Sequence, residues 1–139
     1  KCYSDEKKFE LCEKYGVILT DVERTNTSLI HAKLGAVLAQ EKYDVDNEAV
    51  CRAIATHTTG APAMDQLQQI VFIADYIEPH RDRALHLDEI RYTAFQDLDR
   101  ACEMILTDTL NYLSGSSDMI DPMTQETYDY YHKGGHNNG

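Results

Sequence analysis

The sequence predicts an all-α protein with about six helices. Apolar residues recur at intervals of three and four, no segment shows sustained alternation of β-branched residues, and capping or turn residues separate the apolar stretches. With 139 residues, of which 42% are hydrophobic, the chain can bury a single packed core. We therefore expect one helical domain over residues 1–131 and a flexible Gly/Asn-rich tail over residues 132–139.

Capping and stop residues predict three helices in the first half of the chain. Ser4 can cap the first helix, and Gly16 follows it where a left-handed stop is expected. Residues 17–26, a brief apolar patch followed by polar residues, are predicted to be a connector. The three predicted helices run from Ser4 to about Tyr15, from about Ser28 to Lys42, and from about Glu48 to His57.

Three further helices are predicted in the second half. The first follows Pro62, with Asp65 in its first turn, and carries Asp75; the charged segment 79–86 after it is expected to be an exposed loop. A long helix of about 40 Å is then expected over residues 87–113, with an apolar side made of Ile90, Ala94, Leu98, Ala101, Ile105 and Tyr112. Asp121 and Pro122 should begin a last helix that ends near Tyr131.

Charge and cysteine content narrow the function classes. The formal net charge is -11, so the surface should repel nucleic acid and anionic membranes, and a negative substrate would need a local positive site such as bound metal ions. No apolar run approaches the roughly 18 residues that span a bilayer. The four cysteines are widely spaced, as is typical of reduced cysteines in a cytosolic protein. We therefore expect a soluble cytoplasmic protein.

Asp75 stands on a predicted apolar stripe, where a buried carboxylate would need a cation, a metal ion or several hydrogen-bond donors. His31 and His57 each lie on or beside the inward face of another helix. Together the three side chains form a set that can bind a first-row metal and leave coordination positions for water and substrate. The stripe consists of Leu67, Ile70, Val71, Ala74 and Ile77.

Each of these residues also has an ordinary explanation that the sequence leaves open. His31 alone is more typical of a packed or hydrogen-bonded histidine. A protonated His57 would complement the dipole at a helix end, and Asp75 could pair with Arg81 or Arg83. The spacing alone supports no more than a metallohydrolase hypothesis.

Three stretches resemble one family, the bacterial HD-domain symmetrical bis(5'-nucleosyl)-tetraphosphatases, or YqeK family. They are Ser28-Leu29-Ile30-His31-Ala32-Lys33-Leu34-Gly35-Ala36, His57-Thr58-Thr59-Gly60 and Ile73-Ala74-Asp75-Tyr76-Ile77-Glu78-Pro79-His80-Arg81. The resemblance covers nearly all of residues 1–131. It implies an HD fold, two metal ions, expected to be iron, and hydrolysis of diadenosine tetraphosphate to two ADP.

Carried over residue by residue, the resemblance makes His31 and His57 ligands of one metal and Asp75 a ligand near the other. Lys1 and Arg81 are the candidates for phosphate contact, and Thr58 and Thr59 for polar contacts beside the site. The catalytic residues themselves are not identified. The expected partner is a dinucleoside polyphosphate or another nucleotide.

The chain departs from the family pattern at its beginning. The family also has an upstream histidine and a His-Asp pair within a His-Asp-Tyr-Ala-Lys run, and Lys1 resembles the last residue of that run. If these helices precede the chain, the 139 residues alone should expose a face that they would cover, and should dimerise, aggregate or melt at low temperature. Two alternatives stay open: a nucleotidase of the same superfamily, and a non-catalytic helical module without half of the metal site.

Overall fold

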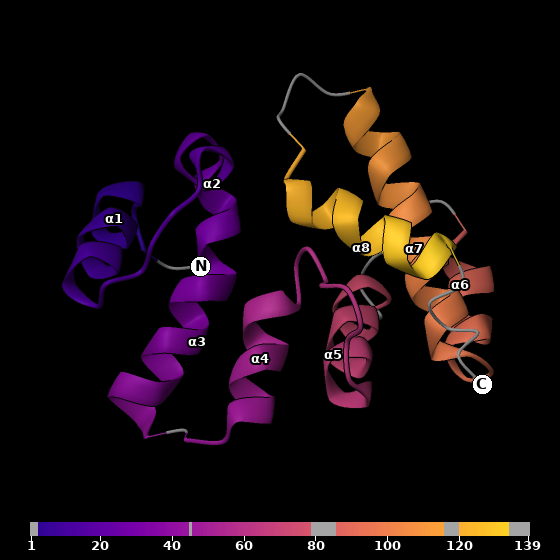
Figure 1. Ribbon diagram of the computed structural model, residues 1–139, viewed down its shortest axis with the longest axis horizontal. Coiled ribbons are helices and arrows are strands. Elements are labelled where there is room, and N and C mark those ends of the chain that lie inside the picture. The colour runs from indigo at the N-terminus through magenta and orange to yellow at the C-terminus, as the bar shows by residue number, and fades with distance from the viewer. Residues whose placement is uncertain (1–2, 45, 79–85, 116–119, 134–139) are drawn as a thin grey trace.

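The computed structural model describes residues 3–44, 46–78, 86–115 and 120–133, and all regular secondary structure within these ranges is helical (Figure 1). The all-α prediction is confirmed, with eight α-helices in these ranges rather than about six. The elements are α1 (Asp5–Lys14), α2 (Asp21–Thr25), the 3-10 turn η1 (Thr27–Leu29), α3 (Ile30–Tyr43), α4 (Glu48–Thr56), α5 (Gln66–Tyr76), α6 (Leu87–Ala94), α7 (Leu98–Ser114) and α8 (Pro122–His132).

The caps that the sequence predicts at both ends of the chain are present. Ser4 Oγ accepts the backbone N–H of Lys7 at 3.2 Å, which satisfies one of the unpaired donors in the first turn of α1. Gly16, just beyond α1, has a φ of +69°. Asp121 accepts the N–H of Met123 at 2.9 Å, with Pro122 at the first position of α8. Local capping chemistry therefore places α1 and α8 correctly.

The predicted connector over residues 17–26 is wrong, because it contains α2. Thr20 Oγ1 accepts the N–H of Glu23 at 3.2 Å, and Glu23 Oε1 accepts the N–H of Thr20 at 2.9 Å. This reciprocal capping box begins the short helix, and buried Val22 anchors it. Lys33 of α3 donates to Glu23 Oε1 at 2.8 Å. Burial raises the pKa of the Glu23 carboxyl, but the hydrogen bonds from Lys33 and Thr20 outweigh this and hold it below its ordinary value.

The single long helix predicted over residues 87–113 is also wrong. The chain turns after Ala94, and Asp97 caps a new helix by accepting the N–H of Arg100 at 3.1 Å. Tyr112, expected on the apolar side, is 79% exposed. The break lets α6 fold back and pack against α7, with Ile90 fully buried.

Two predicted boundaries shift by a few residues. Asp65 lies outside α5 as its N-cap, accepting the N–H of Gln68 at 2.8 Å, rather than in the first turn. His132 belongs to α8 and not to a flexible tail, because its Nδ1 is 2.8 Å from Glu103 Oε2 of α7. Its ring also stacks on Tyr128, one helical turn earlier. The rest of the predicted tail, from residue 134 onward, lies outside the described residues.

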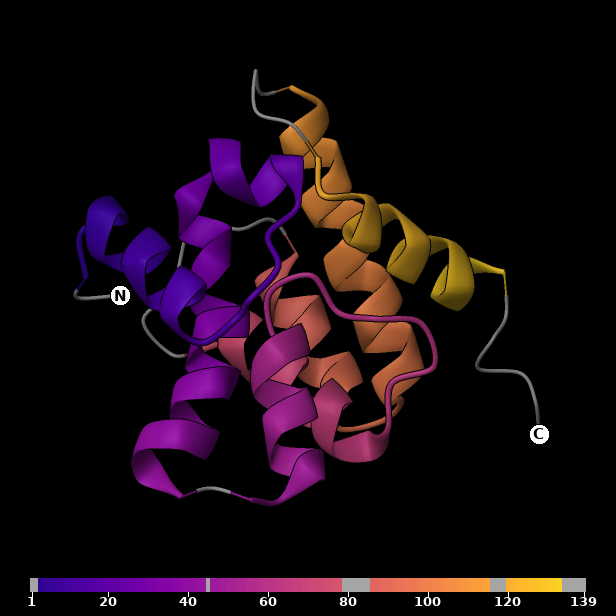
Figure 2. The same ribbon diagram turned by 60° about the vertical axis from the view of Figure 1, so that its left-hand side comes forward.

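Two apolar clusters hold the helices together, and α4 lies between them (Figure 1). The smaller cluster joins α1 to α3 through Leu11, Cys12, Ile30 and Leu34. The larger one joins α5, α6, α7 and α8, and Figure 2 shows α8 running across α7. Its buried members are Met64, Phe72, Ile73, Ile90, Ala101, Cys102, Ile105, Leu106 and Tyr131. The junctions of α3, α4 and α5 therefore connect the two halves of the molecule.

Three of the four cysteines lie in the described residues. Cys12, Cys51 and Cys102 are free and buried. Burial raises the pKa of the Cys102 thiol to about 12, so this side chain stays protonated. None of the described helices combines the length and hydropathy that crossing a bilayer requires.

A histidine–carboxylate pair ties the beginning of α6 to α7 and predicts a pH dependence of stability. His86 Nδ1 lies 3.0 Å from Asp108 Oδ2, and this hydrogen bond with the charge of Asp108 raises the pKa of His86. Because folding raises the pKa of His86, the pair stabilises the folded state fully at pH values below the pKa of histidine in the unfolded chain, about 6.5. This stabilisation is lost as the pH rises through the pKa of His86 in the folded protein. The difference in unfolding free energy between wild type and His86→Asn should therefore shrink from pH 6 to pH 9. Asn tolerates the left-handed backbone at this position.

Chemical denaturation at several pH values measures this difference. The same comparison in an Asp108→Asn background is the control, because the carboxylate that raises the pKa is then gone. A difference that is constant with pH, or that grows toward alkaline pH, would contradict the assignment.

Candidate active site

Two histidines meet where α3 packs against α4. His31 is the second residue of α3, and His57 is the C-cap of α4. Their Nε2 atoms are 3.0 Å apart, and the rings meet edge-on with centroids 4.9 Å apart. Both side chains are half-buried. The structure thus brings together two imidazoles that are 26 residues apart in the sequence.

The hydrogen bond made by His57 Nδ1 determines the tautomer of this histidine. His57 Nδ1 is 2.6 Å from the carbonyl oxygen of Ile54, which can only accept, so Nδ1 carries a proton. In the neutral ring, Nε2 then presents a lone pair toward His31. Thr58 Oγ1 lies 3.3 Å from His31 Nε2, on the same side of the pair. This arrangement can share a proton between the rings or direct imidazole lone pairs toward one cation.

Close approach of α4 to α3 supports the histidine pair. A Cβ atom at Gly35 would lie 3.4 Å from Cγ2 of Ile54, so the glycine gives this side chain room against α3. Ile54 is also the residue whose carbonyl orients His57. The packing of α3 on α4 therefore fixes the distance between the two rings.

Asp75 is exposed, and the prediction that it interrupts a buried face is wrong. The buried residues of α5 are Gln68, Gln69, Phe72 and Ile73. From the predicted stripe, Leu67 and Ile70 are 38% and 47% exposed. The apolar run at residues 70–73 covers more than one face of the helix, and packing against α7 buries Phe72 and Ile73. Asp75 therefore needs no buried counter-charge.

A small cavity nevertheless joins Asp75 to His57. Its volume is about 40 Å³, and its wall includes His57, Thr58 and Asp75 together with Thr109 of α7 and Thr124 of α8. The two threonines were not predicted, because lone hydroxyls within helices carry no recognisable spacing. His31 meets this group through His57 and Thr58. In the described part of the chain, no three His, Cys, Asp or Glu side chains lie close enough together to hold a metal ion.

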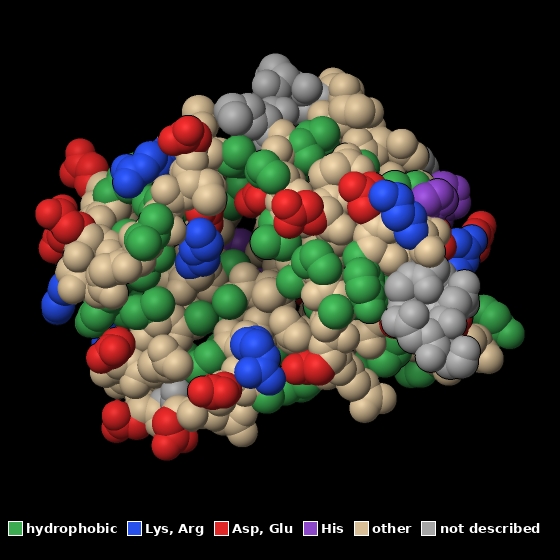
Figure 3. Space-filling model, viewed as in Figure 1, with side chains coloured by type: hydrophobic (Ala, Val, Ile, Leu, Met, Phe, Trp, Pro, Cys, Tyr) green, Lys and Arg blue, Asp and Glu red, His purple; other side chains and the backbone are tan. Residues whose placement is uncertain are grey.

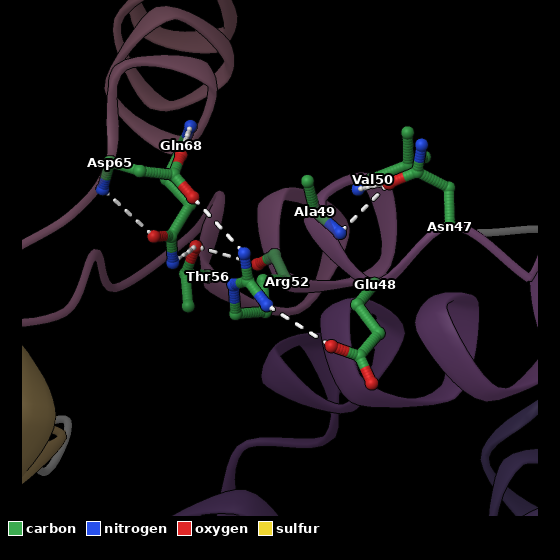
Figure 4. Close-up of polar contacts among 8 residues, drawn as sticks. All are labelled: Asn47, Glu48, Ala49, Val50, Arg52, Thr56, Asp65 and Gln68. Atoms are coloured by element: carbon green, nitrogen blue, oxygen red, sulfur yellow. Dashed lines mark hydrogen bonds and ion pairs between the residues drawn. The ribbon is translucent and has the colours of Figure 1, made fainter.

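Polar contacts hold the end of α4 against the beginning of α5 (Figure 4). Gln68 donates from Nε2 to Thr56 Oγ1 at 3.2 Å, directly before His57. Arg52 lies 3.4 Å from Asp65 and 3.8 Å from Glu48. The hydrogen bond between Gln68 and Thr56 joins the helix that ends at His57 to the helix that carries Asp75, whereas the exposed ion pairs of Arg52 contribute little.

The remaining predicted site residues are placed as follows. Thr59 Oγ1 donates to the carbonyl of Gly60 at 2.9 Å, so in this structure it serves the turn after α4, whereas Thr58 contacts His31. Lys1, Arg81 and Arg83 lie outside the described residues.

Figure 3 shows a hollow in the middle of one face, with apolar side chains around it and a histidine in its depth.

The family model and the relatives found by comparison with known proteins point to the same family. The HD domain model matches residues 6–80. Two relatives are named symmetrical bis(5'-nucleosyl)-tetraphosphatase: one from Halalkalibacterium halodurans, 39% identical over 72% of this chain and 53% of its own, and one from Bacillus subtilis, 36% identical over 76% and 56%. The chain therefore spans about half the length of these relatives.

A solved structure shares the fold. It is the crystal structure of a protein described as a predicted HD superfamily hydrolase involved in NAD metabolism, from Clostridium acetobutylicum, with a TM-score of 0.87 and 35% sequence identity. The match covers 94% of this chain and 68% of that one.

Proposed function

The chain belongs to the HD-domain family, and on that premise we propose that the protein hydrolyses diadenosine tetraphosphate symmetrically, to two molecules of ADP. The names of its relatives support this substrate and this cleavage. The observation in the structure that carries the proposal is the contact between His31 and His57, whose Nε2 atoms lie 3.0 Å apart at the α3–α4 junction.

The donor set fits a first-row divalent metal. Imidazole nitrogens and a carboxylate suit iron, zinc or manganese, and the resemblance to the family favours iron. The hydrogen bond from His57 Nδ1 to the Ile54 carbonyl is the kind of support that metal-binding histidines normally have. His31 and His57 would hold one ion, with Asp75 near a second. Bound metal supplies an activated water and offsets charge on phosphate oxygens.

The chain's own residues would bind and orient the substrate. A polyphosphate approaching a surface with a net charge of -11 needs local donors. Thr58 lies against the histidine pair and can donate to a phosphate oxygen. We assign phosphate contacts to Lys1 and Arg81 as well, with Thr59 as a further polar contact beside the site.

A non-catalytic module is the second candidate, and two observations favour it. The sequence contains no His-Asp dipeptide, and the described residues contain no complete group of metal ligands. A nucleotidase with another substrate is the third candidate, since the site geometry alone does not select the nucleotide.

Product analysis separates these candidates. The chain, and the longer protein if the codons upstream of Lys1 encode a His-Asp pair, would be incubated with Fe²⁺ or Mn²⁺ and diadenosine tetraphosphate, and the products separated by chromatography. We expect ADP alone. ATP plus AMP would contradict symmetrical cleavage, hydrolysis only of another nucleotide would support the nucleotidase, and no hydrolysis with any nucleotide would support the module.

Arg81→Ala should weaken hydrolysis without emptying the metal site. Loss of one charge-assisted phosphate contact costs about 1.5–3 kcal/mol, roughly ten- to a hundredfold in kcat/KM. Metal content should equal that of wild type. Unchanged kinetics, or metal loss in this variant, would remove Arg81 from the assigned contacts.

A further inference from the structure

Arg91 of α6 reaches across to the end of α5. Its Nε donates to the carbonyl of Ile77 at 3.1 Å, and its Nη2 donates to the carbonyl of Glu78 at 3.1 Å. The two acceptors are adjacent in the chain and lie 13 and 14 residues before the arginine. Its side chain is 33% exposed, so these contacts are partly shielded from water.

The chemistry of a helix end explains why an arginine suits this place. The last carbonyls of an α-helix have no N–H partner within the helix, and together they carry a partial negative charge. A guanidinium offers two parallel donors and a permanent charge, so it can satisfy neighbouring carbonyls at once. A lysine has the charge but lacks the planar fork. Within its own helix, Arg91 also lies 3.9 Å from the fully exposed Asp88, a weak ion pair.

The backbone that Arg91 holds leads directly into the candidate active site. Ile77 is the C-cap of α5, and Tyr76 and Asp75, one and two residues before it, both line the cavity shared with His57. The other end of α5 is fixed separately, by the hydrogen bond from Gln68 to Thr56 of α4. Movement at Ile77 therefore passes to Asp75 more directly than to His31, His57 or Thr58, which lie on other elements.

We propose that Arg91 is a positioning residue, which holds Asp75 at the cavity beside His57 by fixing the C-terminal end of α5 to α6. The role of Asp75 as a metal ligand rests on the proposed function. The attachment of the helix end rests on the distances above. The two parts can therefore be tested by different measurements.

The test compares Arg91→Ala and Arg91→Lys with Arg52→Ala. Arg52 is a matched control, because it contacts the other end of α5 through an exposed ion pair. Hydrogen exchange of the Ile77 amide, which bonds to the Ile73 carbonyl at 3.0 Å, reports the helix end. Titration with Co²⁺, followed by its visible spectrum, reports the metal site. Circular dichroism verifies that each variant is folded.

We expect Arg91→Ala to speed exchange at Ile77 and to weaken Co²⁺ binding by roughly 10- to 100-fold, as loss of a residue that orients a ligand does. Arg91→Lys should recover only part of the Co²⁺ affinity, and Arg52→Ala should match wild type. Faster exchange at Ile77 with unchanged Co²⁺ affinity would mean that Arg91 stabilises the end of α5 without positioning Asp75, and would overturn the proposal. Equal loss in Arg52→Ala, or full recovery in Arg91→Lys, would also overturn it.

A different experimental result would contradict the proposed hydrolysis. If the wild-type chain binds Co²⁺ but leaves diadenosine tetraphosphate intact under every metal condition, the proposed hydrolysis is wrong. The Co²⁺ titration of the Arg91 variants still decides whether Arg91 positions the site.

Discussion

His57→Ala is expected to lower the proposed hydrolysis of diadenosine tetraphosphate by more than the roughly hundredfold that loss of a ligand-orienting residue can cost. The reason is that His57 lies at the centre of the candidate site. Its Nε2 meets His31 at 3.0 Å, and its ring lines the cavity that also contains Asp75. Removing the imidazole would take away a proposed metal ligand and, at the same time, the link between His31 and Asp75.

Turnover and metal content should be measured on the same preparation. His31→Ala should resemble His57→Ala, because both rings would bind one ion. His132→Ala is the control, since that histidine contacts Glu103 on α7 and not the His31–His57 pair. Normal metal content with normal turnover in either active-site variant would rule out the assigned ligands.

Stability must be checked in parallel. His57→Ala leaves the Ile54 carbonyl without its imidazole donor, which costs about 1 kcal/mol. This loss is too small to unfold an ordinary domain, so a folded variant that has lost metal and turnover would identify a functional defect.

Predictions from the sequence were correct where the structure depends on residues that are close together in the chain. Ser4 and Asp121 each accept a backbone N–H from the helix that follows them, as predicted. The meeting of His31 and His57 was also predictable, because each lies on or beside the inward face of its helix, and α3 and α4 are consecutive. A short connection between consecutive helices favours antiparallel packing, which brings the beginning of one near the end of the next.

Errors arose where several faces of a helix are apolar. In α5 the sequence offered a stripe through Leu67, Ile70 and Ala74, but tertiary packing buried Phe72 and Ile73 instead. Periodicity defines an amphipathic helix and does not select between two apolar faces. The burial of Asp75 was therefore mispredicted, although the residue does line a cavity with His57.

Other features depend on contacts distant in sequence. The break before Asp97 has a recognisable cap, but the apolar positions on both sides share one helical period, which favoured a continuous helix. Thr109 and Thr124 reach the cavity only because α7 packs on α5 and α8 packs on α7. The contact of Arg91 with the end of α5 likewise depends on α6 folding back. None of these contacts follows from local spacing.

Gly60→Ala is expected to give the largest loss of stability among single substitutions near the site. Gly60 is buried in the turn after His57, with a φ of +71°, and a Cβ there would lie 2.8 Å from Cγ2 of Thr127 on α8. The left-handed conformation costs a non-glycine residue about 1–2 kcal/mol, and overpacking adds about 1–3 kcal/mol. The turn cannot move away freely, because the backbone N–H of Met64 donates to Tyr131 at 3.0 Å.

Two further variants separate these costs in urea denaturation. Gly16→Ala has a similar φ of +69° with nothing within 4 Å of the added Cβ, so it should lose only the conformational part, about 1–2 kcal/mol. Thr127→Ser removes the clashing methyl group and keeps the hydroxyl that donates to the Met123 carbonyl at 2.7 Å. In the Thr127→Ser background, Gly60→Ala should therefore cost about as much as Gly16→Ala. If the cost of Gly60→Ala is the same with threonine and with serine at position 127, contact with α8 does not explain the need for glycine.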